Sequence, residues 1–149
     1  MQALLFNAGE LSFALPARDV VQVLPRQALQ PVVAAPFTVI GLLLFRGALA
    51  PVVDVCRLTL GRDTQPKRSS RIIMTRVQRA GRWREIGLLA ENVMDLCALV
   101  ETTPGLRLPD QPWLGEHLAE HPKTPQLLDV AQLLPELLEA IVLPLEVAP

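Results

Sequence analysis

The sequence predicts an all-β fold, built as a barrel or a sandwich. Many short apolar segments recur along the 149 residues, and residues typical of turns separate them at regular intervals. Only one segment, 131–142, has the spacing of an amphipathic helix, with Leu134, Leu137, Leu138 and Ile141 on one face. No pattern repeats with a fixed period, so we do not expect a repeat array.

The beginning of the chain is predicted to form a hairpin and a third strand. Apolar residues at 4–6 and 11–15 flank a loop that contains Gly9, and their alternation places one face of the second strand in the core. The third strand is expected at 20–24. Closely spaced prolines confine the next segment to edge or irregular extended structure, because proline cannot donate to a β-ladder. These prolines are Pro25, Pro31 and Pro36.

The clearest hairpin in the sequence follows these prolines. Apolar runs at 39–45 and 48–53 are separated by Arg46 and Gly47, and Gly47 can adopt the positive φ angle of a tight turn. Arg46 is therefore expected at an exposed turn tip. A guanidinium at that position serves either solubility or partner binding.

A short helix is predicted directly after this hairpin. Asp54 has the position of an N-cap, whose carboxylate accepts a hydrogen bond from the amide of Cys56 or Arg57. Gly61 is expected to end the helix.

The second half of the chain is predicted to hold one more hairpin and two further strands. A polar loop at 62–70 precedes the hairpin strands at 72–77 and 83–89. A turn and a strand are expected within 91–100, and another strand at 126–130.

Two segments of the second half are predicted to lie outside the sheets. Residues 101–125 contain five prolines and are expected to form an irregular surface passage. The helix at 131–142 is expected to carry Pro135 in its first turn.

Length and composition predict a single cytoplasmic domain, residues 1–149. The longest apolar run is far shorter than the ~20 residues of a membrane span, and the N-terminus lacks the features of a secretory signal. Cys56 and Cys97 occur without a Cys-x-x-Cys pair, so we expect small buried apolar residues rather than a disulfide or a metal site.

The charges are divided along the chain, although the formal net charge is only −1. Residues 57–84 hold nine Lys or Arg against Asp63, a balance of +8, whereas residues 85–149 hold eleven acidic residues against two basic ones, a balance of −9. Such a division can orient a protein between unlike neighbours.

The basic segment 57–84 makes a nucleic-acid-binding β-barrel module the alternative function. Binding of this kind requires the charges on one face, with aromatic residues interleaved for single strands. Trp83 is the only aromatic residue in the segment, so a solvated strand face is the favoured interpretation.

No motif supports an enzyme, a cofactor or a metal site. Residues 117–121, His-Leu-Ala-Glu-His, have the spacing of inverted zinc proteases, but that motif requires a helix, and Gly115 and Pro122 leave room for less than two turns. Nucleophile elbows and phosphate-binding loops are also missing from the sequence. We therefore expect a non-enzymatic protein without cofactor or metal.

Several ordered segments of the chain resemble the CheW family of chemotaxis coupling proteins, which are adaptors. The segments are 13–15, 20–24, 35–41 (Ala-Pro-Phe-Thr-Val-Ile-Gly), 45–47 (Phe-Arg-Gly), 51–54 (Pro-Val-Val-Asp) with Leu58, 86–93 (Ile-Gly-Leu-Leu-Ala-Glu-Asn-Val), 127–130 and 133–134. The resemblance covers about residues 2–135, and 136–149 would be a C-terminal helix and tail. It implies two SH3-like five-stranded barrels packed on a common core, with a short C-terminal helix.

The resemblance also implies a function and partners. Family members are scaffolds that couple chemoreceptors to the CheA histidine kinase in chemosensory arrays. The expected partners are the cytoplasmic tip of a methyl-accepting chemoreceptor and the regulatory domain of a CheA-type kinase. The protein would associate with membrane receptor arrays through these partners, without membrane insertion and without nucleic acid.

Receptor binding in this family uses a hydrophobic groove between the two barrels. The family arginine of the Arg-Gly turn falls at Arg46, which would contact the receptor. The candidate apolar groove positions are Val20, Val23, Pro36, Val39, Ile40 and Leu43, and each of them is equally compatible with a place in the core.

One position departs from the family pattern. Gln22 stands where typical members carry Glu in a Val-x-Glu-Ile stretch, and the loss of that carboxylate removes a potential charge-assisted hydrogen bond, worth about 1.5–3 kcal/mol. Leu44 and Phe45 likewise replace the usual Asn-Leu before the turn. We therefore expect the protein to serve a divergent, non-flagellar chemosensory system with its own receptor and kinase. Gln22 is still expected to lie on the receptor-binding face.

Overall fold

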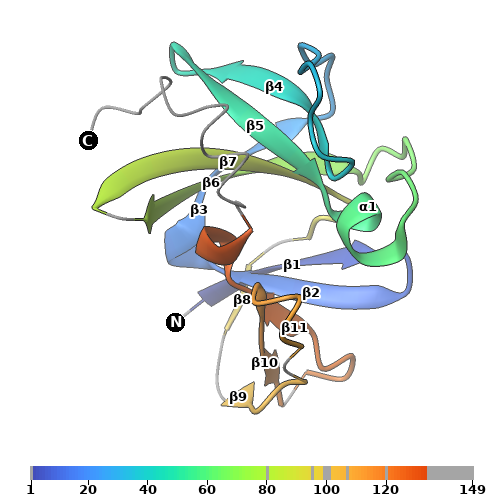
Figure 1. Ribbon diagram of the computed structural model, residues 1–149. Helices are drawn as coiled ribbons and strands as arrows, with labels where there is room; N and C mark the ends of the chain where they lie inside the picture. Colours follow the sequence, from blue (N-terminus) through green and yellow to red (C-terminus); the bar gives the residue numbers. More distant parts are fainter. Residues whose placement is uncertain are drawn as a thin grey trace.

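Two β-sheets lie one above the other in the computed structural model, which describes residues 2–79, 81–94, 96–98, 102–106, 108–119 and 121–133 (Figure 1). The first sheet has the strand order β8-β1-β2-β11-β10-β9 and the second β3-β6-β7-β5-β4. The fold is therefore all-β, as predicted.

The bounds of the elements follow the turn residues of the sequence closely. The first sheet contains β1 (Gln2–Ala8), β2 (Leu11–Pro16), β8 (Leu96–Ala98), β9 (Thr102–Thr103), β10 (Leu114–Leu118) and β11 (Gln126–Leu128). The second sheet contains β3 (Val20–Pro25), β4 (Val39–Phe45), β5 (Ala48–Asp54), β6 (Arg71–Arg79) and β7 (Arg82–Ala90). The helical elements are η1 (Ala17–Asp19), α1 (Val55–Leu60) and η2 (Val130–Gln132).

Three apolar clusters fill the spaces inside and between the sheets. The central cluster joins the two barrels and includes Phe6, Leu15, Ile73 and Leu88, all of which are buried. A second cluster fills the barrel of the second sheet, and a small third cluster lies on the other face of the first sheet.

Alternation along the strands explains why several of them are buried on both faces. On β6, Ile73 faces the central cluster whereas Ile72 and Met74 face the interior of the second barrel. On β2, Phe13 belongs to the central cluster and Ala14 to the cluster of the first barrel. The strands β1 and β7 show the same division, so the prediction of a single buried face on the second strand was incomplete.

Both predicted hairpins of the second sheet are confirmed. The strands β4 and β5 pair around Arg46 and Gly47, and β6 pairs with β7 without a bulge. The predicted cap of α1 is confirmed as well, since the Asp54 carboxylate accepts from the amides of Cys56 and Arg57, and Gly61 ends the helix in a left-handed conformation.

The region 101–125 is more regular than predicted. It contains β9 and β10, and β10 pairs with both β9 and β11. Trp113, Leu114 and Leu118 are buried, so long-range packing supplies the order that a proline-rich segment does not signal locally. The short β9 gives the first sheet six strands rather than five.

The predicted C-terminal helix lies mostly outside the described residues. Its first two positions fall within η2, and residues 134–149 are not described. In the part of the chain that is described, no helix is long and apolar enough to cross a membrane.

Candidate partner-binding surface

The β4–β5 turn presents Arg46 at an open tip. Arg46 has φ 52° and Gly47 has φ 82°, so two successive residues adopt the left-handed region that suits a two-residue hairpin turn. The Arg46 guanidinium lies 5.0 Å from the centroid of the Phe45 ring, and no ion pair to Arg46 occurs among the described residues. The predicted exposure of Arg46 at the turn tip is thus confirmed.

Strand β3 carries three further candidate residues on two different surfaces. Val20 and Val23 are half-buried and pack against the central cluster, whereas Gln22 is exposed. A register shift between Val20 and Gln22 interrupts the ladder to β6. Because of this bulge, Val20 and Val23 face the same cluster although they are three residues apart, while Val21 packs in the second barrel.

The candidates on and before β4 divide between surface and core. Pro36 and Ile40 are half-buried, and the Pro36 carbonyl accepts from the Val39 amide at 3.0 Å. Val39 and Leu43 are each only 5% exposed and belong to the core clusters. They offer little surface to a partner, because Val39 packs in the central cluster and Leu43 in the interior of the second barrel.

Two neighbouring depressions adjoin these candidates. Val23 lines one of about 390 Å³, and Ile40 lines one of about 270 Å³. Arg26 lines both, so the depressions are adjacent. Lys67, Arg68 and Arg71 line the larger one, which gives it a basic rim.

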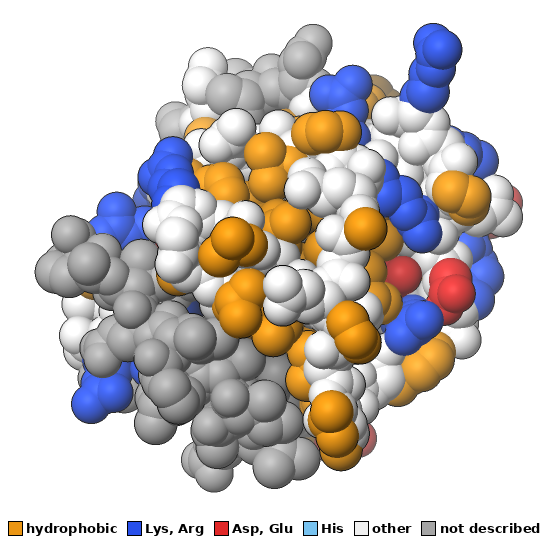
Figure 2. Space-filling view, turned by 90° about the horizontal axis from the view of Figure 1, so that it is seen from above, with side chains coloured by type: hydrophobic (Ala, Val, Ile, Leu, Met, Phe, Trp, Pro, Cys, Tyr) orange, Lys and Arg blue, Asp and Glu red, His pale blue; other side chains and the backbone are white. Residues whose placement is uncertain are grey.

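Exposed apolar side chains lie near the candidate residues. Leu44 on β4 is exposed, as are Val33 and Phe37 in the loop that precedes β4. The view onto β4 and this loop shows hydrophobic side chains across the middle of the face, with Lys and Arg around them (Figure 2). Arg57 covers Phe37 with its guanidinium 4.8 Å from the ring centroid and donates to the Phe37 carbonyl at 3.0 Å.

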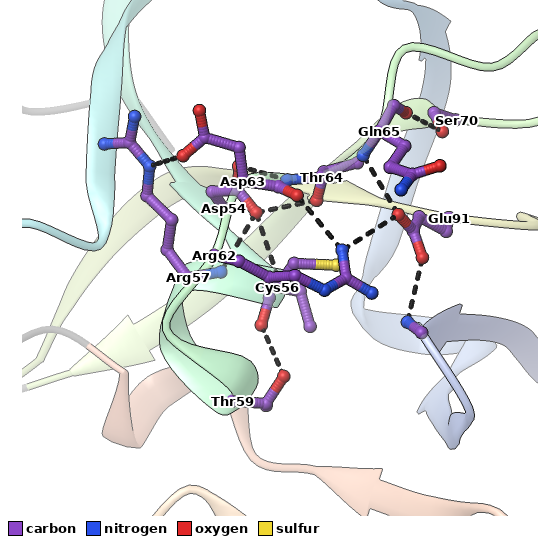
Figure 3. Close-up of polar contacts among 12 residues, drawn as sticks. Asp54, Cys56, Arg57, Thr59, Arg62, Asp63, Thr64, Gln65, Ser70 and Glu91 are labelled. Atoms are coloured by element: carbon purple, nitrogen blue, oxygen red, sulfur yellow. Dashed lines mark hydrogen bonds and ion pairs between the residues drawn. The ribbon is translucent and has the colours of Figure 1, made fainter.

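A network of buried polar groups holds the loop after α1 (Figure 3). Asp54 is 2% exposed, and its carboxylate accepts from the amides of Cys56 at 2.9 Å and Arg57 at 3.2 Å. The same carboxylate accepts from the Thr64 amide at 3.0 Å and the Thr64 hydroxyl at 2.6 Å. The buried Thr64 therefore ties the polar loop back to the end of β5.

Glu91 connects this loop to the first sheet. It is 4% exposed, and its carboxylate accepts from the Gly9 amide at 2.8 Å and the Gln65 amide at 2.9 Å, with Arg62 at 3.7 Å. Burial raises the pKa of this carboxyl, but the two amides and the Arg62 guanidinium outweigh burial, so the pKa is lowered from 4.5. The sequence analysis assigned no such role to Glu91, and its position directly after an apolar strand was the available signal.

Cys56 adjoins both carboxylates of this network. It is a free, buried cysteine, and burial raises the pKa of its thiol. The prediction that Cys56 is a small buried residue is thus confirmed. The side chain of Cys97 is not among those that the structure describes.

Among the described side chains of the basic segment 57–84, which do not include Arg79, four cations are engaged locally rather than gathered on one face. Arg57 pairs with Asp63 at 2.7 Å, and Arg62 lies near Glu91. Arg84 is buried, and Arg76 stacks over Trp83 with 4.4 Å between guanidinium and ring centroid. This distribution argues against the nucleic-acid alternative, which requires the charges on one face.

The two histidines lie in a hairpin rather than on a helix. His117 belongs to β10, and His121 lies in the turn that leads to β11. His117 Nδ1 is 2.7 Å from the Thr124 carbonyl oxygen. Among the described residues, which do not include Glu120, no group of His, Cys, Asp or Glu is arranged to hold a metal ion.

The comparisons with known proteins agree with this architecture. A crystal structure of the scaffolding protein TtCheW from Thermoanaerobacter tengcongensis superimposes with a TM-score of 0.75 and 19% sequence identity, covering 87% of this chain and 84% of that chain. The likeness establishes the fold of two SH3-like barrels. A search of curated protein sequences gave no significant match.

The family model for the CheW-like domain matches residues 2–137. The chain therefore belongs to the CheW-like domain family, whose members are non-catalytic scaffold proteins.

Proposed function

We propose that this protein is a coupling scaffold that joins the cytoplasmic tip of a methyl-accepting chemoreceptor to the regulatory domain of a CheA-type histidine kinase. Membership of the CheW-like domain family over residues 2–137 supports the scaffold class. Its cytoplasmic location at receptor arrays and its organisation as a single domain are parts of the same proposal.

The observation that carries the proposal is the conformation of Arg46. A left-handed conformation disfavours residues with a Cβ atom by about 1–2 kcal/mol, and Gly, Asn or Asp would fit the turn better. Arg46 is exposed, and no acidic partner holds it within the described part of the chain. Backbone strain of this kind is commonly retained at functional sites. We therefore assign the Arg46 guanidinium to contact with the receptor.

The apolar candidate residues suit a helical partner with an apolar face. Leu44 is exposed beside the turn, and Val20, Val23 and Ile40 keep part of their surface accessible. Apolar surface framed by basic residues is typical of a protein interface with a polar rim. Val39 and Leu43 would support this surface from beneath, and Pro36 would border it.

Gln22 supports a divergent receptor. Its side chain is exposed and uncharged, and no hydrogen bond holds it within the described residues. A receptor that presents a cation for a carboxylate at this position would lose the ion pair, because the Gln22 amide carries no charge. The protein would then serve a chemosensory system with its own receptor and kinase, outside flagellar chemotaxis.

Co-sedimentation tests this proposal directly. Receptor cytoplasmic fragments and the CheA-type kinase of the same genome are mixed with wild type or with Arg46→Glu. Wild type should recruit the kinase to the receptor, and the charge reversal should weaken recruitment about tenfold or more.

Lys123→Glu is the matched control, because Lys123 is an exposed cation at the β10–β11 turn of the other barrel. Recruitment by this variant should equal that of wild type. Recruitment that survives Arg46→Glu would reject the assigned contact, and failure of the wild type to recruit any kinase would reject the scaffold itself.

A further inference from the structure

A second candidate site lies at the opposite end of the molecule from Arg46. A pocket of about 760 Å³ lies between the β1–β2 turn, α1 and the β10–β11 hairpin. In Figure 1 these elements are at the right and lower right, whereas the β4–β5 turn is at the upper left. The volume falls in the range of about 300–1,000 Å³ that is typical of small-molecule sites.

Asn7 brings an unpartnered amide to this pocket. It lies on β1, is only 8% exposed and lines the pocket. Its backbone groups are bonded to Glu91, with distances of 2.7 and 2.9 Å. The side-chain amide, by contrast, has no hydrogen-bond partner in the described part of the chain. Because Asn7 lines the pocket, this amide is open to hydrogen bonding with a molecule bound there.

Ser12 extends this polar group. It is the register partner of Asn7 in the β1–β2 ladder, so the two side chains lie side by side on one face of the sheet. The Ser12 hydroxyl also lacks a partner among the described residues. Two other polar groups of the pocket are engaged, since the Thr59 hydroxyl donates to the Val55 carbonyl and the Gln126 amide donates to the Gly115 carbonyl, whereas Gln111 and Thr124 add further polar lining.

An apolar surface lines the pocket beside these groups. Phe13, Trp113 and Leu114 are buried and belong to the central cluster. They expose little surface themselves, so the exposed Leu11 supplies most of the accessible apolar lining for an apolar side chain of a ligand.

The charges around the pocket are balanced. Glu10 and Lys123 line it with opposite signs, and no ion pair joins them in the structure as described. His117 also lines the pocket, and its Nδ1 atom is occupied by the Thr124 carbonyl oxygen at 2.7 Å. A strongly anionic ligand such as a nucleotide therefore does not suit the lining.

From these features we infer that the pocket binds a small zwitterionic molecule with an apolar side chain, of the amino-acid or dipeptide type. Its ammonium group pairs with Glu10 and its carboxylate with Lys123. A peptide group offers both a donor and an acceptor to the Asn7 amide, with Ser12 beside it. The apolar side chain packs against Trp113 and Phe13. Neither the receptor contact nor the kinase contact proposed above is needed for this activity.

An NMR titration of the full chain with L-leucyl-L-leucine tests the inference. The side-chain amide of Asn7 and the indole N–H of Trp113 should shift on titration, with an apparent Kd in the millimolar range or tighter, whereas the indole of Trp83 should not move. Asn7→Leu should weaken binding about tenfold. Lys123→Gln should weaken it about threefold, because Lys123 is exposed.

Two controls keep the test independent of folding. Lys67→Gln removes an exposed cation that does not line this pocket, and its binding should equal that of wild type. The N-acetylated dipeptide amide lacks both charges, so it should bind wild type more weakly than the zwitterion does. Absence of shifts with L-leucyl-L-leucine at about 10 mM, or equal binding of the zwitterion and the capped dipeptide, overturns the inference.

Discussion

At the scale of single residues, Glu91 links a charge to the stability of the fold. Burial raises its pKa, but the Gln65 and Gly9 amides and Arg62 lower it below 4.5. The folded protein therefore binds this proton less readily than the unfolded chain does. The resulting stabilisation is complete above the unfolded-state pKa and is lost as the pH falls through the folded-state pKa. Glu91→Gln should lower the free energy of unfolding at pH 7 by about 2 kcal/mol and flatten its decline in acid, measured by urea denaturation across pH.

Glu10→Gln is the control for this prediction. Glu10 is an exposed carboxylate in the same turn as Gly9, so its substitution should change the free energy of unfolding by less than about 0.5 kcal/mol. An acid dependence that is identical in wild type and Glu91→Gln would contradict the role assigned to Glu91.

At the scale of elements, substitutions in the turn of the β4–β5 hairpin should affect stability and partner binding differently. Arg46→Asn should raise the free energy of unfolding by about 0.5 kcal/mol, because Asn tolerates the left-handed conformation better, while kinase recruitment should fall. Gly47→Ala should lower the free energy of unfolding by about 1 kcal/mol through backbone strain alone, since no described residue beyond its two chain neighbours comes within 4 Å of a Cβ at this position. Thermal unfolding of both variants measures these changes, and a loss of stability in Arg46→Asn would contradict the interpretation of the turn.

At the scale of the whole molecule, the shared central cluster should make the two barrels unfold together. Strands β1, β2, β6 and β7 are buried on both faces, so neither barrel keeps its apolar surface covered alone. Trp83 on β7 and Trp113 before β10 are the two tryptophans of the chain and report on different barrels. Trp113→Phe and Trp83→Phe leave one reporter each.

Urea unfolding of these two variants, followed by fluorescence and by circular dichroism, should give one midpoint for both probes within each variant. Because the two midpoints are compared within one variant, any change in stability that the substitution causes affects both midpoints equally. Separate fluorescence and dichroism midpoints would show that the barrels are independent units, contrary to the single domain that we propose.

The sequence by itself determined those features that depend on neighbouring residues. The β4–β5 and β6–β7 hairpins, the Asp54 cap and the end of α1 at Gly61 were all predictable, because Gly turns, alternation and capping act over a few residues. The exposure of Arg46 followed from the same local signal. Family resemblance added the arrangement as two barrels, which local patterns alone left as a barrel or a sandwich.

The tertiary structure decided what depends on residues that are distant in sequence. Glu91 meets Gly9 across 82 positions, and the pocket at Asn7 forms only when the β10–β11 hairpin packs beside the β1–β2 turn. Val39 became core because it packs in the central cluster, and Leu43 because the second barrel covers the inner face of β4. Burial is a property of packing between elements, and a strand pattern shows which residues share a face without showing what covers that face.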